Sequence, residues 1–276
     1  MTGTGGWLSV RVRPGADREA VVAALFDAGG QALQEVGDEL LTQLPDSTDT
    51  ESLVRAVRAG SPDAEVQIAV APDVDWLSEW KRGARVQELG MITIVPPWLA
   101  EGRDATHTVV IEPAMAFGTG DHATTRGVVR LLQRVLRPGD VVADLGAGSA
   151  VLSIAAAKLG AARVAAIEID PDAMGNAEEN VVRNDVGDRV TVIEGDATVL
   201  LPLVAPVRMV LANIIAEVLR ELLPVIDAAL TWDGVAILSG ILLDERESML
   251  DTLRRAGWSV IAEDTEDVWW SVAVRR

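Results

Sequence analysis

Residues 144–150, DLGAGSA, decide the fold that we expect for this chain. They follow an apolar segment that is typical of a buried strand, and a helix pattern begins directly after them. The glycines Gly146 and Gly148 allow a tight turn in which backbone N–H groups face a ligand at the start of the helix. A glycine pair by itself also occurs in turns that bind nothing. In the order strand, loop and helix, it predicts the first unit of a doubly wound sheet with a ligand at the carboxyl end of the first strand.

The chain continues with segments that alternate between strand and helix patterns. Alternation of this kind predicts a mostly parallel sheet with right-handed crossovers and with helices on both faces. The predicted strands cover residues 141–144, 163–168, 190–193, 207–212, 234–239 and 259–262, and the predicted helices cover residues 151–158, 172–182, 216–229 and 244–256.

The first seventy residues have a different pattern. Their strand and helix signals follow the order β-α-β-β-α-β, which is the split βαβ arrangement of a small α+β domain. The predicted strands cover residues 7–14, 32–36, 39–44 and 65–70, and the predicted helices begin near Asp17 and Asp49.

The signals are weaker between the two patterned regions. Residues 71–105 include a strand pattern that is stopped by Pro96 and Pro97, but they show no regular alternation. We therefore expect a first domain over residues 1–70, a structured linker over residues 71–105 and a larger domain over residues 106–276.

The composition excludes several classes of protein. The 276 residues include 42 acidic and 24 basic ones, which gives a formal net charge of −18. Such a chain repels nucleic acid and anionic membranes and attracts a basic partner. The absence of cysteine excludes disulfides, thiolate zinc sites and cysteine nucleophiles, and two histidines are too few for a histidine-rich metal site. Without a signal segment or a long apolar run, we expect a cytoplasmic protein that uses no metal.

The surroundings of the glycine loop distinguish between two classes of Rossmann-like enzyme. The dinucleotide fingerprint G-x-G-x-x-G requires a small residue where this chain has Val151, which argues against a nicotinamide-dependent oxidoreductase. The pattern D-x-G-x-G-x-A, from Asp144 to Ala150, instead resembles the first motif of the S-adenosylmethionine-dependent methyltransferases. These enzymes usually have a third glycine at the position of Ala150, and alanine is small enough for similarly close packing.

Polar residues at the ends of later strands are candidate ligands of this cofactor. Glu168 lies 22 residues after Gly146, where a carboxylate can accept hydrogen bonds from both ribose hydroxyls. Asp170 is an alternative, although it is better placed to cap the next helix. Asp196 either accepts a hydrogen bond from the adenine amino group or forms a turn. Asn213 either binds the substrate amine or the cofactor, or caps a helix.

Residues 113–125, PAMAFGTGDHATT, carry a more specific resemblance. They are similar to the signature P-G-M-A-F-G-T-G-T-H-P-T-T of the PrmA family, bacterial methyltransferases that modify ribosomal protein eleven of the large subunit. The similarity extends over nearly the whole chain. It implies a Rossmann-like class I methyltransferase domain with a mostly parallel seven-stranded sheet, preceded by a small ferredoxin-like domain that recognises the substrate.

The resemblance also implies roles for single residues. It places cofactor contacts on Thr125, Gly146, Glu168 and Asn213, and Gly148 of the glycine loop joins them. Glu168 replaces a more usual aspartate and keeps its charge. The signature itself departs from the family at three positions, so it supports the cofactor more strongly than the substrate; these are Ala114 for glycine, Asp121 for threonine and Ala123 for proline.

Methyl transfer to nitrogen depends on alignment and needs neither a metal nor a covalent enzyme intermediate. We expect Asn213 to orient the amine. A loop that contains Phe117 and Thr119 is expected to cover the methyl donor and to exclude water. His122 is either the proton acceptor or a partner in a structural hydrogen bond.

We therefore predict an S-adenosylmethionine-dependent N-methyltransferase that modifies lysine side chains of a basic ribosomal protein of the large subunit, with the N-terminal amine as a further candidate target. The alternatives are an enzyme of the same fold that acts on another protein or on a small-molecule amine, an oxidoreductase, and a non-catalytic module that binds the cofactor. We expect a monomer that contacts neither nucleic acid nor membranes directly.

Overall fold

The computed structural model describes residues 7–15, 17–29, 34–36, 39–70, 85–112 and 120–276. The chain divides into two compact units, Met1–Gly83 and Ala84–Arg276. Among the described residues, no helix combines the length and the apolar character that a membrane span requires.

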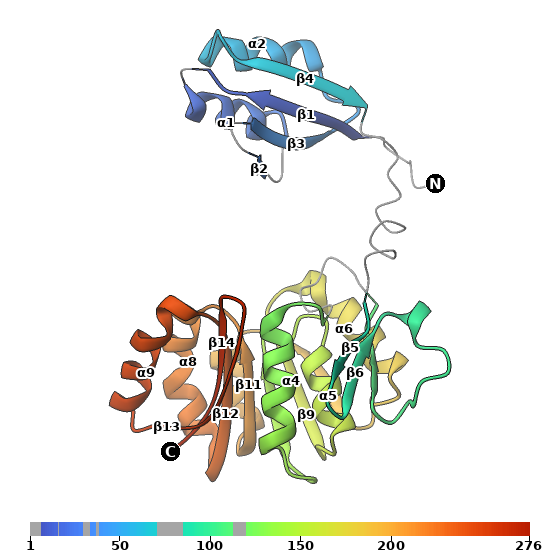
Figure 1. Ribbon diagram of the computed structural model, residues 1–276, viewed down its shortest axis with the longest axis vertical. Coiled ribbons are helices and arrows are strands. Elements are labelled where there is room, and N and C mark those ends of the chain that lie inside the picture. Colours follow the sequence, from blue (N-terminus) through green and yellow to red (C-terminus); the bar gives the residue numbers. More distant parts are fainter. Residues whose placement is uncertain (1–6, 16, 30–33, 37–38, 71–84, 113–119) are drawn as a thin grey trace. The chain divides into compact units, whose positions relative to one another are not determined.

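The first unit follows the predicted β-α-β-β-α-β order (Figure 1). Its antiparallel sheet has the strand order β2-β3-β1-β4. Apolar side chains of the sheet and of both helices form one core, and the carboxylates of Asp17 and Asp49 cap the two helices as expected. The elements are β1 (Trp7–Arg13), α1 (Arg18–Asp27), β2 (Gln34–Val36), β3 (Glu39–Pro45), α2 (Thr50–Gly60) and β4 (Glu65–Val70).

The second unit is built on a seven-stranded sheet with the order β10-β9-β8-β11-β12-β14-β13. The first five strands in this order are parallel, and β14 and β13 are antiparallel to their neighbours. The strands are β8 (Val141–Leu145), β9 (Arg163–Glu168), β10 (Val190–Glu194), β11 (Val207–Asn213), β12 (Leu230–Leu242), β13 (Ser259–Glu266) and β14 (Trp269–Arg275).

Helices cover both faces of this sheet (Figure 1). Because side chains alternate along a strand, Val142 of β8 packs with one layer of helices and its neighbour Ala143 packs with the other. The first layer consists of α4 (Ala123–Val135), α5 (Val151–Lys158) and α6 (Pro171–Arg183), and the second of α7 (Ala197–Val204), α8 (Ala216–Ala229) and α9 (Arg246–Arg255).

The domain boundary differs from the expected one. We predicted a linker over residues 71–105, but residues 84–105 belong to the second unit. They contribute β5 (Gln87–Leu89) and β6 (Ile92–Val95) to a three-stranded sheet that β7 (Thr108–Val110) completes, and a short 3-10 helix follows β6 at Pro97–Leu99. Ile92 and Ile94 are buried in the same core as α4 and α5, and this packing fixes the segment to the larger unit.

Candidate active site

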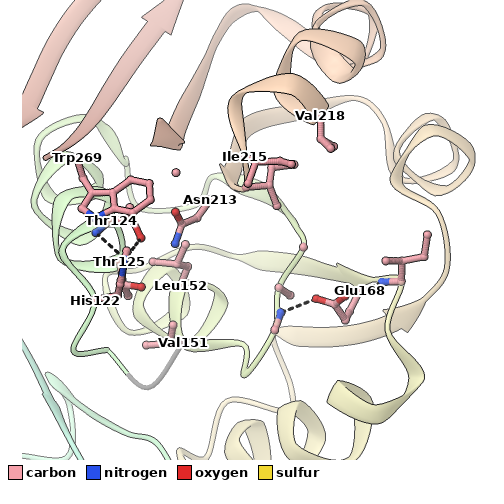
Figure 2. A pocket seen from close by; sticks show the side chains of 16 residues that line it. His122, Thr124, Thr125, Val151, Leu152, Glu168, Asn213, Ile215, Val218 and Trp269 are labelled. Atoms are coloured by element: carbon pink, nitrogen blue, oxygen red, sulfur yellow. Dashed lines mark hydrogen bonds between the residues drawn. The ribbon is translucent and has the colours of Figure 1, made fainter. Parts of the chain in front are cut away.

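A pocket of about 560 Å³ lies at the carboxyl ends of the parallel strands, where doubly wound sheets bind their ligands. Figure 2 shows Glu168 on one side of it and Thr125, Asn213 and Trp269 on the other. Five of the six predicted cofactor residues line this pocket, and these are Thr125, Gly146, Gly148, Glu168 and Asn213.

The glycine loop reaches the pocket only through a left-handed backbone. Gly146 has φ +67°, and a Cβ atom at this position would lie 2.8 Å from Cγ2 of Ile214. Gly148 has φ +53°, and Ala150, which precedes helix α5, has φ +63°. The methyltransferases that this loop resembles usually have glycine at the position of Ala150. Glycine adopts a positive φ without strain, so this preference has a conformational reason as well as the packing reason that we expected from the sequence.

Glu168 ends strand β9 and closes the glycine loop. Its Oε2 accepts a hydrogen bond from the Gly148 amide at 2.7 Å, and its Oε1 accepts from the amides of Ile169 and Asp170 at 2.9 and 3.0 Å. The side chain is 7% exposed and lines the pocket. A carboxylate fixed by three amides still has lone pairs for ligand hydroxyls.

The opposite wall of the pocket presents polar side chains of Thr125 and Asn213. Thr125 is fully buried, and its Oγ1 has no hydrogen-bond partner among the described residues. Asn213, at the end of β11, likewise lines the pocket. A buried hydroxyl without a partner is costly, so this wall is built for a polar ligand. Together with Glu168 and the glycine loop, Thr125 and Asn213 suit an adenosyl cofactor, which carries a ribose and a polar amino-acid part.

Comparisons with known proteins identify the family. The profile of the family described as Ribosomal protein L11 methyltransferase (PrmA) matches residues 16–276. The chain belongs to the PrmA family. It is therefore an S-adenosylmethionine-dependent methyltransferase with a class I fold, as predicted.

Two relatives show how far the similarity extends. The ribosomal protein L11 methyltransferase of Thermus thermophilus is 36% identical over 94% of this chain and 95% of its own length. The one from Carboxydothermus hydrogenoformans is 37% identical over 73% of this chain, and the match spans 66% of that protein. The crystal structure of a ribosomal protein L11 methylase from Lactobacillus delbrueckii subsp. bulgaricus has 31% identity and a TM-score of 0.63, with 70% of this chain and 98% of that one covered.

Two departures from the PrmA signature have local consequences. The Asp121 carboxylate accepts a hydrogen bond from Nε2 of Gln87 in β5 at 2.9 Å, so it ties the signature loop to the three-stranded sheet. Ala123 is the first residue of α4, where proline is favoured because its missing N–H costs nothing. The alanine leaves the helix start intact.

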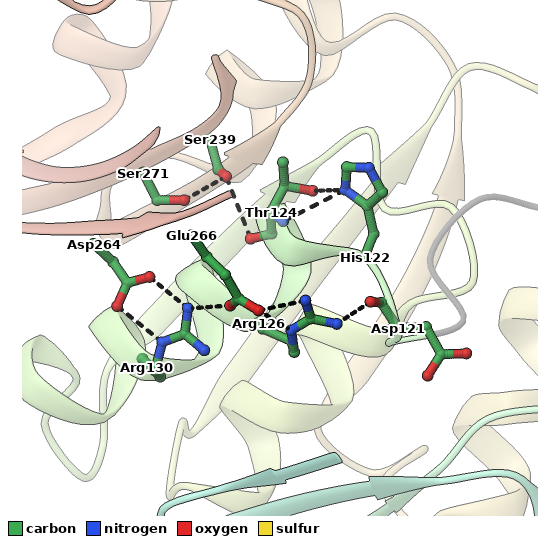
Figure 3. Close-up of polar contacts among 9 residues, drawn as sticks. All are labelled: Asp121, His122, Thr124, Arg126, Arg130, Ser239, Asp264, Glu266 and Ser271. Atoms are coloured by element: carbon green, nitrogen blue, oxygen red, sulfur yellow. Dashed lines mark hydrogen bonds and ion pairs between the residues drawn. The ribbon is translucent and has the colours of Figure 1, made fainter. Parts of the chain in front are cut away.

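His122 caps helix α4 beside the pocket. Its Nδ1 accepts a hydrogen bond from the Thr124 amide at 3.4 Å and lies 2.8 Å from Thr124 Oγ1 (Figure 3). The ring meets the indole of Trp269 edge to face, with centroids 5.0 Å apart. Burial, with a smaller effect of Arg126, lowers the pKa of His122, so the imidazole is neutral near pH 7. This contact is the structural hydrogen bond that we had set against a role as proton acceptor.

An ion-pair network holds α4 against strand β13 (Figure 3). Arg130 makes two hydrogen bonds to Asp264, at 2.8 and 2.5 Å, and one to Glu266 at 2.7 Å. Arg126 binds Glu266 and the backbone carbonyl of Asp121. The hydrogen bond from Arg126 is the main cause that lowers the pKa of Glu266. The network therefore positions strands β13 and β14, and Trp269 at the start of β14 lines the pocket.

A buried carboxyl lies directly beneath the glycine loop. Asp144 is 1% exposed; its Oδ2 accepts a hydrogen bond from Ser153 Oγ at 2.6 Å, and its Oδ1 has no partner among the described residues. Burial raises the pKa of Asp144 to about 7. The loop therefore rests on a group that titrates near neutral pH.

The structure does not bring every predicted residue to the pocket. Asp196 is not among the lining residues, and its carboxylate caps helix α7 through the Thr198 amide at 2.7 Å. Asp170 caps α6, as we expected. Phe117 and Thr119, predicted to cover the methyl donor, lie outside the described residues.

Sequence reasoning missed part of the pocket. Trp269, Ile214, Ile215 and Val218 supply much of its apolar wall. Ile214 and Ile215 directly follow Asn213, and this neighbourhood is the signal that could have identified them. Trp269 opens a strand that we had not predicted, and only the topology of the sheet brings it close.

Proposed function

We propose that this chain transfers methyl groups from S-adenosylmethionine to lysine amines, and to the N-terminal amine, of ribosomal protein L11. The observation that carries the proposal is the single pocket in which five predicted cofactor residues meet an apolar mouth. The names of its relatives support the choice of substrate.

The cofactor, when bound, supplies an electrophilic methyl group on a sulfonium centre. Glu168 binds the ribose hydroxyls, and the left-handed glycine loop lets the backbone approach the ligand closely. Thr125 and Asn213 hold the polar amino-acid end of the ligand on the opposite wall. Alignment of this kind can account for about 7–11 kcal/mol of a reaction barrier.

The substrate amine must be neutral to attack. A lysine in water has a pKa of about 10.4, and an apolar site lowers it because burial disfavours the charged form. Ile215, Val218 and Trp269 provide this environment. The Asn213 carboxamide orients the lone pair of the amine, and Phe117 and Thr119 remain proposed parts of the covering loop. The caps made by His122 and Asp196 argue against the roles of proton acceptor and adenine ligand for these residues.

The first unit is proposed to hold the substrate. Residues 1–70 carry 11 acidic and 5 basic residues, which suits a basic partner. The unit has its own apolar core. A chain that lacks residues 1–83 should retain cofactor affinity and lose methylation of the protein substrate. Loss of both activities would contradict a separate docking role.

The decisive experiment supplies labelled S-adenosylmethionine and free L11 to the full-length protein. We expect label on L11, and we expect Asn213→Ala to reduce the rate by at least tenfold with L11 binding unchanged. Label on other proteins but not on L11 would contradict the substrate and leave the chemistry standing. It would favour the alternative, a methyltransferase of the same fold with another protein or a small amine as substrate. A monomeric state and a cytoplasmic location remain predictions.

A further inference from the structure

A second pocket, of about 590 Å³, lies at the opposite end of the central sheet. The parallel strands β11 and β12 begin there, and the antiparallel strand β14 ends there, close to the C-terminus in Figure 1. The pocket also receives the end of α4 and the start of β13. It is therefore separate from the methyl-transfer site.

Arginines dominate its lining, although the chain as a whole has a net charge of −18. Five of them line this one pocket, against the single carboxylate of Asp233, and they are Arg134, Arg137, Arg208, Arg275 and Arg276. Only part of this charge is neutralised. Arg137 pairs with Asp233 at 2.7 Å and Arg276 with Asp227 at 2.5 Å, whereas Arg134 and Arg275 make no ion pair with any described residue.

Arg208 is the group that points most directly to a ligand. Its side chain is about nine-tenths buried, and its Nε and Nη1 atoms are buried without a hydrogen-bond partner among the described residues. The Asp233 carboxylate is 3.6 Å from Nε, and Arg137 donates a hydrogen bond to the same carboxylate oxygen at 2.7 Å. A buried guanidinium with unsatisfied donors is costly unless an anion compensates it. Arginine also matches the geometry of phosphate oxygens with two parallel donors.

The edge of the pocket carries an aromatic platform. Trp232 lines the pocket, and its side chain is 94% exposed. An exposed indole beside a cluster of arginines is suited to stack on a nucleobase whose phosphate lies on the arginines. The volume of the pocket is within the range of sites for small ligands, and the negative charge of the whole chain disfavours a long polyanion.

We propose that this pocket binds a mononucleotide, with the phosphate on Arg208, Arg134 and Arg275 and the base on Trp232. The test titrates the full-length protein with adenosine diphosphate by calorimetry at low salt. Saturating S-adenosylhomocysteine is present throughout, so that the methyl-transfer pocket is filled and does not bind the adenine. We expect one saturable site. Inorganic phosphate should bind at least about fivefold more weakly, because it lacks the stacking base.

Variants identify the site. The double variant Arg134→Gln, Arg275→Gln should weaken binding by at least tenfold, and Trp232→Ala by about fivefold or more. Asp233→Asn should tighten binding, because it removes the competing carboxylate from Arg137 and Arg208. The matched control is Arg163→Gln, which removes an exposed arginine at the start of β9, and it should leave binding unchanged. Unchanged affinity for S-adenosylhomocysteine shows that each variant is folded.

Three results would overturn the proposal. These are the absence of saturable binding, equal affinity for inorganic phosphate and the nucleotide, and much tighter binding of a ten-nucleotide single-stranded RNA than of the nucleotide. The last result would make this surface an RNA contact. None of the outcomes depends on methylation of L11, so the two proposals fail separately.

Discussion

The two ends of the central sheet carry pockets of nearly equal volume and opposite character. The pocket at the carboxyl end has apolar walls with a few fixed polar groups, among them Glu168 and Thr125. The pocket at the amino end is lined by five arginines, and its apolar platform, Trp232, is exposed. The same strands thus separate a site with an apolar environment from a site suited to an anion.

The difference between them lies in how the sequence encodes each pocket. The first depends on motifs that are continuous along the chain, such as residues 144–150, because a strand and the loop after it always reach the same edge. The second pocket is lined by side chains from several separate segments between Arg134 and Arg276. These segments do not form a continuous sequence motif. Motif reading therefore finds only one of them.

The largest effect is expected from Glu168→Ala, which removes the carboxylate from the first pocket. Charged hydrogen bonds contribute about 1.5–3 kcal/mol each, so the affinity for S-adenosylhomocysteine should fall by one to two orders of magnitude in calorimetry. Nucleotide affinity at the arginine pocket should not change. Glu179→Ala removes an exposed carboxylate from α6 and serves as the control. Unchanged cofactor affinity would show that the ribose assignment is wrong.

Asp144→Asn tests the buried carboxyl beneath the same pocket. Because burial raises its pKa to about 7, the folded protein holds a proton that the unfolded chain releases near pH 4. This group therefore makes the wild type less stable as the pH rises from 5 to 8. The stability of the variant relative to the wild type should increase over this range by about 2 kcal/mol.

Urea unfolding at several pH values measures this difference. Asp172→Asn, an exposed position in the first turn of α6, is the control and should show no comparable trend. Parallel pH profiles for wild type and Asp144→Asn would mean that Asp144 is ionised throughout the range.

Much of the second unit could be predicted because its strands are buried on both faces and end in polar residues. The glycine loop, Glu168 and Asn213 were placed at the pocket in this way, and their roles in binding stay predictions. Helix α7 was missed because its sequence, ATVLLPLV, is apolar except for Thr198 and contains Pro202, so it shows no helical period. Asp196 was left open between an adenine ligand and a turn residue; its carboxylate caps α7, and the ligand role stays a prediction. Trp269 could not be found, because its place depends on the antiparallel pairing of β14 with β12.

The two interpretations of His122 can be separated by two substitutions. Asparagine is a good helix cap and alanine is a poor one. If His122 acts only as a cap, His122→Asn should keep both stability and methylation rate, and His122→Ala should lose about 1 kcal/mol of stability. A large loss of rate in His122→Asn, with stability unchanged, would instead identify the imidazole as the proton acceptor.

The smallest effect concerns strain in the glycine loop. Ala150 has φ +63°, a conformation that costs an alanine about 1–2 kcal/mol and a glycine almost nothing. Glycine loses more entropy on folding, which offsets part of the gain, so Ala150→Gly should stabilise the second unit by about 0.5–1 kcal/mol. The same change at Ala156, inside helix α5 and fully buried, should destabilise it by about 1 kcal/mol. Thermal unfolding of both variants measures the difference, and equal destabilisation would show that the loop relaxes around Ala150. Because Ala150 and Ala156 lie outside the lining of the arginine pocket, neither substitution should change nucleotide affinity there.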